Sequence, residues 1–354
     1  MENVILNETP IRTSKNFNIN NIKIESSVIP SVIGKFDNIE ILNNNPNIKI
    51  EQKTFDTDLS YGLGKIFTDQ VNQNGNNGFK ININGKNSED FIFNFKFDNK
   101  NTQLVENIEI ISEKRSCSNL IIKYESEKDL ECYHNGIINV LAKEDSEINI
   151  IFVNLLNNNS NNFISIQNEI KCNAKVNYTI IDFGGKNSIT NYYSNIVGEN
   201  AENNVNTIYL GKENQFFDLN YIAHLKGEKS NVNIDVVGAI SQNAKKHFKG
   251  TIDFKKGAKK AKGNENEYCM ILSDTAKSIA LPMLLCSEED VEGNHSSAAG
   301  KIGEKELFYI MSRGFNKKDA LKLMVRARFN NVLENIRNQI LKEQILEEID
   351  SRLE

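Results

Sequence analysis

The sequence contains no tryptophan, only four prolines and only four histidines in 354 residues. It also lacks a long hydrophobic run, because its longest apolar stretch, Ile279–Cys286, is far shorter than the roughly 20 residues that a membrane helix needs. The first residues, MENVILNETP, have no basic region followed by an apolar stretch, so they do not predict a signal peptide. We therefore expect a soluble, cytoplasmic protein that does not bind membranes.

An excess of positive charge is missing as well. The formal net charge of -5 and the pI near 5.7 give no bulk attraction to nucleic acid, and the basic stretch Lys245–Lys262 is interpreted as a solvated turn face. The five cysteines are scattered without CxxC spacing, which is not typical of a disulfide framework. We expect most of them, including Cys286, to be buried small hydrophobic residues.

Common catalytic signatures are absent from the sequence. We find no GxxxxGK phosphate loop, no GxGxxG after a strand, no HExxH and no GxSxG. The chain therefore has no visible means of hydrolysing a nucleotide, and we expect it not to be an enzyme. His134 lies two residues from Cys132, but a single Cys-x-His pair is weak evidence for a metal site, and a structural role is expected. His224 is expected to be a satisfied core histidine.

The stretch from about Phe79 to Phe254 is a succession of short β-like runs. Phe91–Phe97 alternates apolar and polar residues, the period of two that marks a strand with one buried face. Breaks such as Gly198–Asn200 separate the runs, and Asn and Gly suit them because both tolerate the left-handed backbone of sharp turns. The other predicted runs are Ile108–Ile111, Leu120–Tyr124, Ile137–Leu141, Ile148–Leu156, Val176–Phe183, Val205–Leu210, Phe216–Leu225 and Val232–Val237.

Many strands with hardly any helical pattern leave two architectures open, a sandwich or barrel and a β-solenoid whose coils stack strand on strand. No sequence period decides between them. Asparagine makes up roughly one residue in six, to which we give little functional weight.

After about Ile302 the pattern becomes helical. Glu304–Met311 predicts a short helix that Gly314 ends, and Asn316 is the predicted N-cap of further helices that reach Leu353. Near the N-terminus, Asp58–Phe67 is interpreted as a helix weakened by two glycines. We predict three parts: an N-terminal extension over residues 1–75, a β core over 76–303 and a helical domain over 304–354.

One segment, from Cys286 to Gly314, combines chemistry-bearing side chains with small residues. Asp290, Glu292 and His295 lie close together and precede a run of Ser, Ala and Gly. Small side chains let another backbone approach closely, and thiolate, imidazole and carboxylate are ligand types suited to iron or an iron–sulfur species.

This part of the sequence resembles the SufB/SufD family, and the matching motifs occur in family order over roughly a hundred residues. Pro10–Thr13 with Asn20, the short N-terminal region and the lack of a long SufB-type preamble make the chain most like the SufD branch. The matching positions are His247–Phe254, Gly257-Ala258, Asn264-Glu265, Met270–Ala276, Pro282, Glu289–Val291, His295, Gly300 and Leu307–Gly314.

The resemblance implies a right-handed parallel β-helix core with a C-terminal helical domain, in a scaffold subunit of the SUF iron–sulfur cluster assembly complex. It implies pairing with a SufB-type subunit and docking of a SufC-type ATPase on the helical region. His295 falls on the family histidine near the subunit interface, a candidate ligand for a transient iron–sulfur cluster. No stably bound cofactor is expected. The candidate docking residues are Leu307, Phe308, Tyr309, Arg313 and Gly314.

The sequence also departs from the family pattern. Gly293 stands where a proteobacterial-type member would carry a cysteine, and Ile310 where many SufB chains would carry one, which puts a thiolate contribution in doubt. Two other hypotheses stay open. A parallel β-helix polysaccharide lyase or hydrolase is disfavoured by the absence of tryptophan and of a secretion signal. A homodimeric scaffold without SufB is compatible with the sequence.

Overall fold

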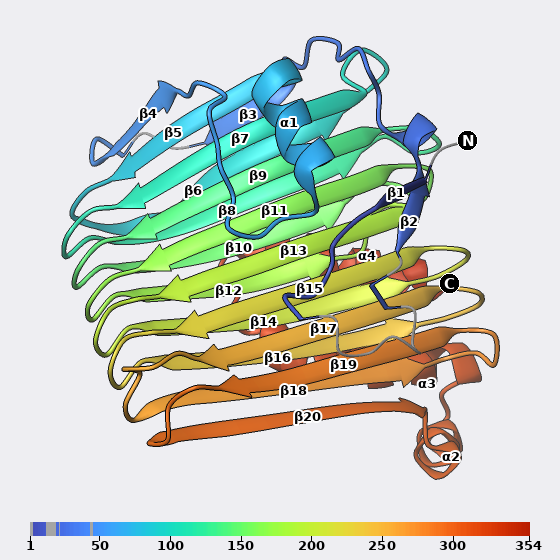
Figure 1. Ribbon diagram of the computed structural model, residues 1–354. Coiled ribbons are helices and arrows are strands. Elements are labelled where there is room, and N and C mark those ends of the chain that lie inside the picture. The colour runs from blue at the N-terminus through green and yellow to red at the C-terminus, as the bar shows by residue number, and fades with distance from the viewer. Residues whose placement is uncertain (1–2, 12–18, 21, 43–44) are drawn as a thin grey trace.

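The chain winds into a β-solenoid, shown by the computed structural model in Figure 1, which describes residues 3–11, 19–20, 22–42 and 45–354. Each coil places one strand in each of two nine-stranded sheets, and consecutive coils stack in parallel register. The predicted mainly β, parallel β-solenoid is therefore confirmed, and the sandwich or barrel is wrong. Arg12 and Thr13 of the N-terminal motif lie outside the described residues.

The two sheets take alternate strands of the chain. The sheet that carries the C-terminal helices, here called the helix-side sheet, contains β3 (Ile39–Leu42), β6 (Lys86–Phe97), β8 (Cys117–Ser126), β10 (Glu147–Leu155), β12 (Lys175–Asp182), β14 (Glu202–Gly211), β16 (Asn231–Ile240), β18 (Ala261–Ile271) and β20 (Val291–Lys301). The opposite sheet, here called the N-terminal-side sheet, contains β4 (Ile48–Gln52), β5 (Asn77–Ile83), β7 (Gln103–Ser112), β9 (Tyr133–Ala142), β11 (Asn161–Ile170), β13 (Asn187–Ile196), β15 (Phe216–Leu225), β17 (Lys245–Phe254) and β19 (Lys277–Cys286).

The alternation read from the sequence fills the space between the sheets. Phe91, Phe93, Phe95 and Phe97 all point into one continuous apolar core, and none of them is more than 1 % exposed. Because parallel strands pair in register, each inward side chain stacks on the inward side chains of the coils before and after it. Burying one phenylalanine side chain contributes about 1.5–3 kcal/mol, so these stacks dominate the stability of the first coils.

Sharp corners join the two strands of each coil. Non-glycine residues with positive φ recur there, but only some are Asn, and Lys229 and Lys260 adopt the same left-handed conformation. Gly198 and Gly227 have another role at these corners. A Cβ on Gly227 would lie 1.8 Å from the carbonyl oxygen of Gly198, so the backbones of the two successive corners lie too close together for any side chain. The predicted turns are correctly located, but their glycines allow close approach of the backbones rather than left-handed geometry.

Asparagine has a structural role on the outer face of the helix-side sheet. Seven asparagines on successive strands form a ladder, in which each side-chain amide donates to the Oδ1 of the asparagine one coil earlier at 2.8–3.0 Å. Such ladders stabilise stacked strands because every rung satisfies its neighbour. The rungs are Asn119, Asn149, Asn177, Asn204, Asn233, Asn264 and Asn294.

The two ends of the solenoid differ. At the N-terminal end, β3 and β4 add antiparallel to β6 and β5, so residues of the predicted extension join the two sheets. Helix α1 (Lys65–Asn74) packs over β7 and β9, and it begins after the two glycines that the sequence placed within a helix. The short hairpin of β1 (Asn3–Ile5) and β2 (Lys23–Glu25), followed by η2 (Ser26–Val28), lies on the same side. At the C-terminal end, β19 and β20 are the last strands of their sheets (Figure 1).

Three C-terminal helices follow: α2 (Glu304–Ser312), α3 (Lys317–Leu333) and α4 (Gln339–Arg352). Asn316 caps α3 by accepting the backbone N–H of Asp319, and Gly314 has a positive φ of 98°, as predicted. Helices α3 and α4 cover the helix-side sheet behind the solenoid in Figure 1, where they form a second apolar cluster with its outward side chains. No helix in the described part of the chain combines the length and hydrophobicity that a membrane span requires.

Candidate functional site

His295 lies in the middle of β20, the terminal strand of the helix-side sheet, and it is exposed. It pairs in register with Glu265 of β18, which is fully buried in the solenoid interior. Directly opposed residues of parallel strands point to the same face, so the imidazole of His295 belongs to the interior side of the last coil. The structure thus places the predicted histidine at the open end of the solenoid.

Two buried carboxylates lie one coil beneath this end. Glu265 and Glu267 both face inward from β18, among side chains that are otherwise mostly apolar. Glu267 is well partnered, because it accepts hydrogen bonds from Lys246 Nζ at 2.5 Å, Ser297 Oγ at 2.8 Å and Tyr209 Oη at 3.2 Å. Lys246 and Glu267 form an ion pair with no exposed side-chain surface. Ser297, on the same strand as His295, links the terminal coil to this pair.

Glu265 has no such support. Neither of its carboxyl oxygens has a hydrogen-bond partner among the described residues, and burial raises its pKa to about 8, with the nearby Glu267 adding to the effect. Gly250 on the opposite sheet makes room for it, since a Cβ there would lie 2.2 Å from the carboxyl carbon. At neutral pH the group is therefore mostly a neutral acid held directly under His295.

Sequence reasoning missed these carboxylates as site residues. Glu265 enters the sequence prediction only as part of a family motif, and Glu267 and Lys246 are not among the predicted site residues. The available signal was the alternation along β18, where Gly263, Glu265 and Glu267 share one face with the buried Cys269. Two glutamates on the buried face of a strand are unusual, because burying a charged group without a partner is costly.

The cysteines do not gather around His295. Cys286 is exposed at the end of β19, and its Sγ donates to the carbonyl oxygen of Glu288 at 2.8 Å, so the expectation that it is buried is wrong. Cys172 is also exposed and Cys117 is partly buried, so only Cys132 and Cys269 are buried, and the expectation that most of the five cysteines are buried is wrong. Within residues 3–11, 19–20, 22–42 and 45–354, no three His, Cys, Asp or Glu side chains converge as a metal site.

Two further expectations about basic and imidazole side chains can be judged. His134 is fully buried and contacts Asn162 at 2.7 Å and Glu106 at 3.3 Å through its two ring nitrogens, so its structural role is confirmed. The interpretation of Lys245–Lys262 as a solvated turn face is wrong for two lysines. Lys246 and Lys249 are fully buried in ion pairs, because β17 turns one toward the interior and the other beneath the N-terminal segment.

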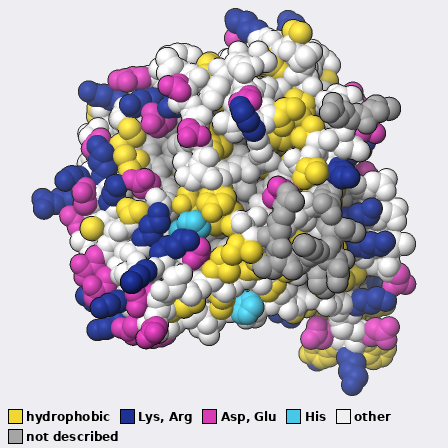
Figure 2. Space-filling view, in the orientation of Figure 1, with side chains coloured by type: hydrophobic (Ala, Val, Ile, Leu, Met, Phe, Trp, Pro, Cys, Tyr) yellow, Lys and Arg dark blue, Asp and Glu magenta, His cyan; other side chains and the backbone are white. Residues whose placement is uncertain are grey.

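The predicted docking residues lie on or just after α2, which begins three residues after the end of β20. Helix α2 has no buried residue, and Phe308 and Tyr309 are 73 % and 59 % exposed. The guanidinium of Arg313 lies over the Tyr309 ring at 5.2 Å and donates to its hydroxyl, next to Gly314. Figure 2 shows apolar side chains flanked by charged ones on the projection that α2 forms at the lower right of Figure 1. Leu307 is partly buried.

A groove of about 700 Å³ separates α2 and α3 from the outer face of β18. Tyr268 lies at its floor, with the guanidinium of Arg328 from α3 over its ring at 5.0 Å. Tyr268 follows Glu267 directly, and successive side chains of a strand point to opposite faces. Strand β18 therefore faces this groove on its outer side and carries the buried carboxylates on its inner side. The remaining lining is largely apolar and includes Met270, Ile310 and Met324.

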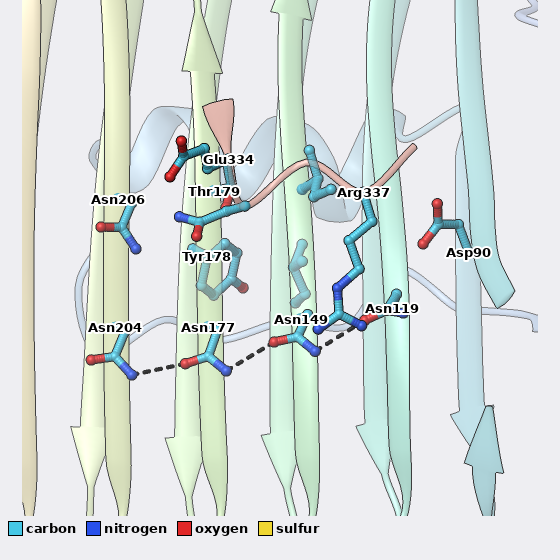
Figure 3. A pocket seen from close by; sticks show the side chains of 13 residues that line it. Asp90, Asn119, Asn149, Asn177, Tyr178, Thr179, Asn204, Asn206, Glu334 and Arg337 are labelled. Carbon is cyan, nitrogen blue, oxygen red and sulfur yellow. Dashed lines mark hydrogen bonds between the residues drawn. The ribbon is translucent and has the colours of Figure 1, made fainter. Parts of the chain in front are cut away.

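A second groove, of about 380 Å³, runs between the asparagine ladder and the loop that joins α3 to α4. Figure 3 shows Arg337 reaching across it toward Asn119 and Asn149, with Glu334 and Asp90 at its margins. Its floor consists of amides that already bond to one another along the ladder. The carboxylates at its margins are the acid–base groups of this groove, and its floor offers polar amide contacts.

Comparison with known proteins gives a consistent result. Residues 95–328 match the family model described as SUF system FeS cluster assembly, SufBD core domain. An iron–sulfur cluster assembly SufBD family protein of Pyrococcus horikoshii is 34 % identical over 167 residues, which are 46 % of this chain and 36 % of that protein. The SufD proteins of Bacillus subtilis and Escherichia coli are 22 % identical over 259 residues and 27 % identical over 157 residues. These matches cover 72 % and 44 % of this chain, and 59 % and 37 % of the relatives' lengths.

Proposed function

The chain belongs to the SufBD family of SUF-system iron–sulfur cluster assembly proteins, and from this premise we propose that it is a non-catalytic, cytoplasmic scaffold subunit of that system. One observation carries the proposal: the last coil brings an exposed histidine, a free strand edge and an exposed helix into a single stretch, from Val291 to Ser312. A scaffold needs these surfaces more than it needs catalytic side chains.

The free edge supports pairing with another subunit. Among the described strands, β20 hydrogen-bonds only to β18, and no charged or proline residue lies between Gly293 and Gly300. Proteins usually protect an exposed edge with charges, prolines or bulges, because unpaired backbone groups recruit other strands. An unprotected edge of this length suits a partner with a matching edge. We propose a SufB-type subunit as that partner, with a second copy of this chain as the alternative.

The exposed helix supports docking of a SufC-type ATPase. An aromatic pair with large exposed area, Phe308 and Tyr309, is the kind of anchor that dominates protein interfaces. Arg313 and Gly314 close the helix beside this pair. In the proposed complex the ATPase supplies the nucleotide chemistry that this sequence lacks, and α2 and the adjoining α3 receive it.

The cargo in this proposal is a transient iron–sulfur cluster rather than a resident cofactor. His295 would supply one imidazole ligand from the edge strand, and the partner subunit would supply others. Glu267 and its hydrogen bond from Ser297 would hold the backbone of the terminal coil in place under that ligand. A histidine at an interface can bind and release iron as the two subunits move apart or together.

The test is affinity purification of the tagged full chain from cells of its own organism, with partners identified by mass spectrometry. Recovery of a SufC-type ATPase with a SufB-type chain is expected, and recovery with the ATPase alone would favour the homodimer. The variant Phe308→Ala should lose the ATPase but keep the strand-edge partner, since only α2 is altered. Recovery of neither partner with the unaltered chain would refute the scaffold proposal.

The role of His295 has its own test. His295→Ala should leave the complex assembled but lower the iron–sulfur cluster content of client enzymes in cells, because one ligand of the nascent cluster is lost. Asn294→Ala is the matched control, since Asn294 is exposed on the same strand but faces outward. Equal cluster maturation in the two variants would remove His295 from the mechanism.

A further inference from the structure

A second histidine, His224, lies on the outer face of the N-terminal-side sheet, away from the solenoid interior. It stands on β15 between Asn195 of β13 and Asp253 of β17, with which it pairs in register. The sequence interpretation of His224 as a satisfied core histidine is wrong in one respect. Only 7 % of the residue is exposed, yet its Nε2 has no hydrogen-bond partner among the described residues.

The geometry around Nε2 is that of an incomplete metal site. Nε2 lies 3.6 Å from Asp253 Oδ2. Two ligands of a tetrahedral metal ion with bonds of about 2.1 Å are separated by about 3.4 Å, so the two atoms need to move little to share one ion. On the other side of the ring, Nδ1 lies 3.3 Å from the hydroxyl of Tyr193, which fixes the ring orientation as outer hydrogen bonds do in metal sites.

The ring is also in the protonation state that a metal needs. Burial lowers the pKa of His224 to about 4, with the positive charge of Lys255 contributing, so the imidazole is neutral at pH 7. Tyr61 packs against both His224 and Tyr193, with ring centroids 5.5 Å and 4.8 Å away, and it shields the site from bulk water. A neutral, oriented imidazole beside a buried carboxylate is a pair of donors suited to borderline divalent metals.

The charges near the site are of both signs: Lys255 and Lys226 lie close to His224 and lower its pKa, whereas acidic residues line a cavity beyond Tyr193. This cavity, of about 350 Å³, has Tyr193 and Asn195 in its wall. The charged residues that line this cavity are mostly acidic, and the single lysine is paired with one of them at 3.2 Å. The Oδ1 of Asn195, which pairs with His224 on the side away from Asp253, is buried without a partner among the described residues. The charged lining residues are Lys53, Asp56, Asp58, Glu109 and Glu169.

One group competes for the carboxylate. Lys255 Nζ lies 2.5 Å from the same Asp253 oxygen, but its side chain is 39 % exposed and can turn into solvent. Because Asp253 is buried, a cation bound by His224 and Asp253 must displace the lysine from a partly buried ion pair.

We propose that His224 Nε2 and Asp253 Oδ2 bind a divalent transition-metal ion such as Fe²⁺, Co²⁺ or Zn²⁺, with water completing the coordination. This site is separate from His295 in sheet, face and ligands, and the inference does not rest on the scaffold function.

The probe is Co²⁺ alone, titrated into the full-length chain and followed by its visible absorption, which becomes intense in low-symmetry, four-coordinate sites. His224→Gln and Asp253→Asn should each weaken binding at least about tenfold. Lys255→Gln should strengthen it, because the competing charge is removed. Fe²⁺ added without oxygen should displace the bound Co²⁺ from the unaltered protein only when it is in excess, because Fe²⁺ binds a given nitrogen and oxygen site more weakly than Co²⁺.

Two histidine variants serve as controls. His247→Gln alters a partly buried imidazole on the same sheet face that is surrounded by lysines, and His295→Gln alters the edge histidine. Both should bind Co²⁺ as the unaltered protein does, and circular dichroism confirms that each variant is folded. The proposal is overturned if His224→Gln binds Co²⁺ normally while folded, or if His295→Gln alone abolishes binding. The latter result would leave the scaffold function intact.

Discussion

Replacing Glu265 by glutamine should stabilise the isolated protein at neutral pH, and by an amount that depends on pH. The carboxyl titrates near its ordinary pKa of 4.5 in the unfolded chain, but burial raises its pKa to about 8 in the folded state. The folded protein therefore holds a proton that the unfolded chain has released, and stability falls as pH rises from about 4.5 to about 8. Below that range the carboxyl is protonated in both the folded and the unfolded state, so it costs no stability.

The magnitude follows from the size of the shift. At 1.36 kcal/mol per pKa unit, holding the proton costs about 3 kcal/mol at pH 7 and about 5 kcal/mol above pH 8. Glutamine has nearly the same shape and no charge, so Glu265→Gln should remove this cost. Its side chain gains no new hydrogen bond, because the carboxyl oxygens have no partner to exchange.

The assay is urea unfolding of the unaltered protein and the variant at pH 5, 6, 7 and 8. Circular dichroism is the suitable signal, since the chain has no tryptophan. The difference in unfolding free energy between the two proteins should widen steadily with pH, while every other titrating group cancels from it. A difference of constant size between pH 5 and pH 8 would show that Glu265 is ionised in the folded state, and would refute the reasoning.

Three further changes test other parts of the fold. Lys249→Met leaves the buried Asp218 carboxylate and the carbonyl oxygen of Asn7 without their ammonium partner. It should lower the unfolding free energy by about 3–5 kcal/mol in urea melts, and adding Asp218→Leu should recover part of that loss. Asn204→Ala removes one rung of the asparagine ladder, and with it two hydrogen bonds, and should cost about 1–3 kcal/mol in the same assay. Asn206→Ala, outside the ladder, is the control. Burial raises the pKa of Asp182 to about 7. The stability of the unaltered protein relative to Asp182→Asn should therefore fall by about 4 kcal/mol between pH 4 and pH 8. A difference in unfolding free energy that does not change with pH would contradict the effect of burial.

The strands, the turns and the C-terminal helices could be predicted from local patterns, because each depends on residues close in sequence. Phe91–Phe97 reveals a buried face by its own alternation, and Asn316 caps α3 by a contact three residues away. The choice of a solenoid could not be made from periodicity. Successive rungs of the asparagine ladder are separated by 27 to 31 residues, so the repeat has no constant length for a sequence comparison to find.

The site was predictable only in part, for a similar reason. His295 stood out because a resemblance marked it, and the edge strand follows from its position near the end of the β region. Lys246 and Glu267 lie 21 residues apart, and although alternation along β18 places Glu267 on a buried face, nothing local shows that Lys246 is its partner. Which lysine of β17 faces the interior depends on strand register, and register is fixed by the coils on either side.

The energetics of the last coil bear on its function. Most of the interior is filled by stacked apolar side chains that each stabilise the fold, but the coil beneath β20 contains an unpartnered Glu265 and a fully buried ion pair between Lys246 and Glu267. A buried pair of this kind is often no more stabilising than apolar residues of similar volume, and Glu265 is a net cost at neutral pH. Side chains that lower stability and have shifted pKa values are found most often at functional sites. Other buried titratable groups, such as Asp182 and the His134–Glu106 pair, lie in the middle coils, but Glu265 and the Lys246–Glu267 pair lie directly under His295, where a working surface at this end would use them.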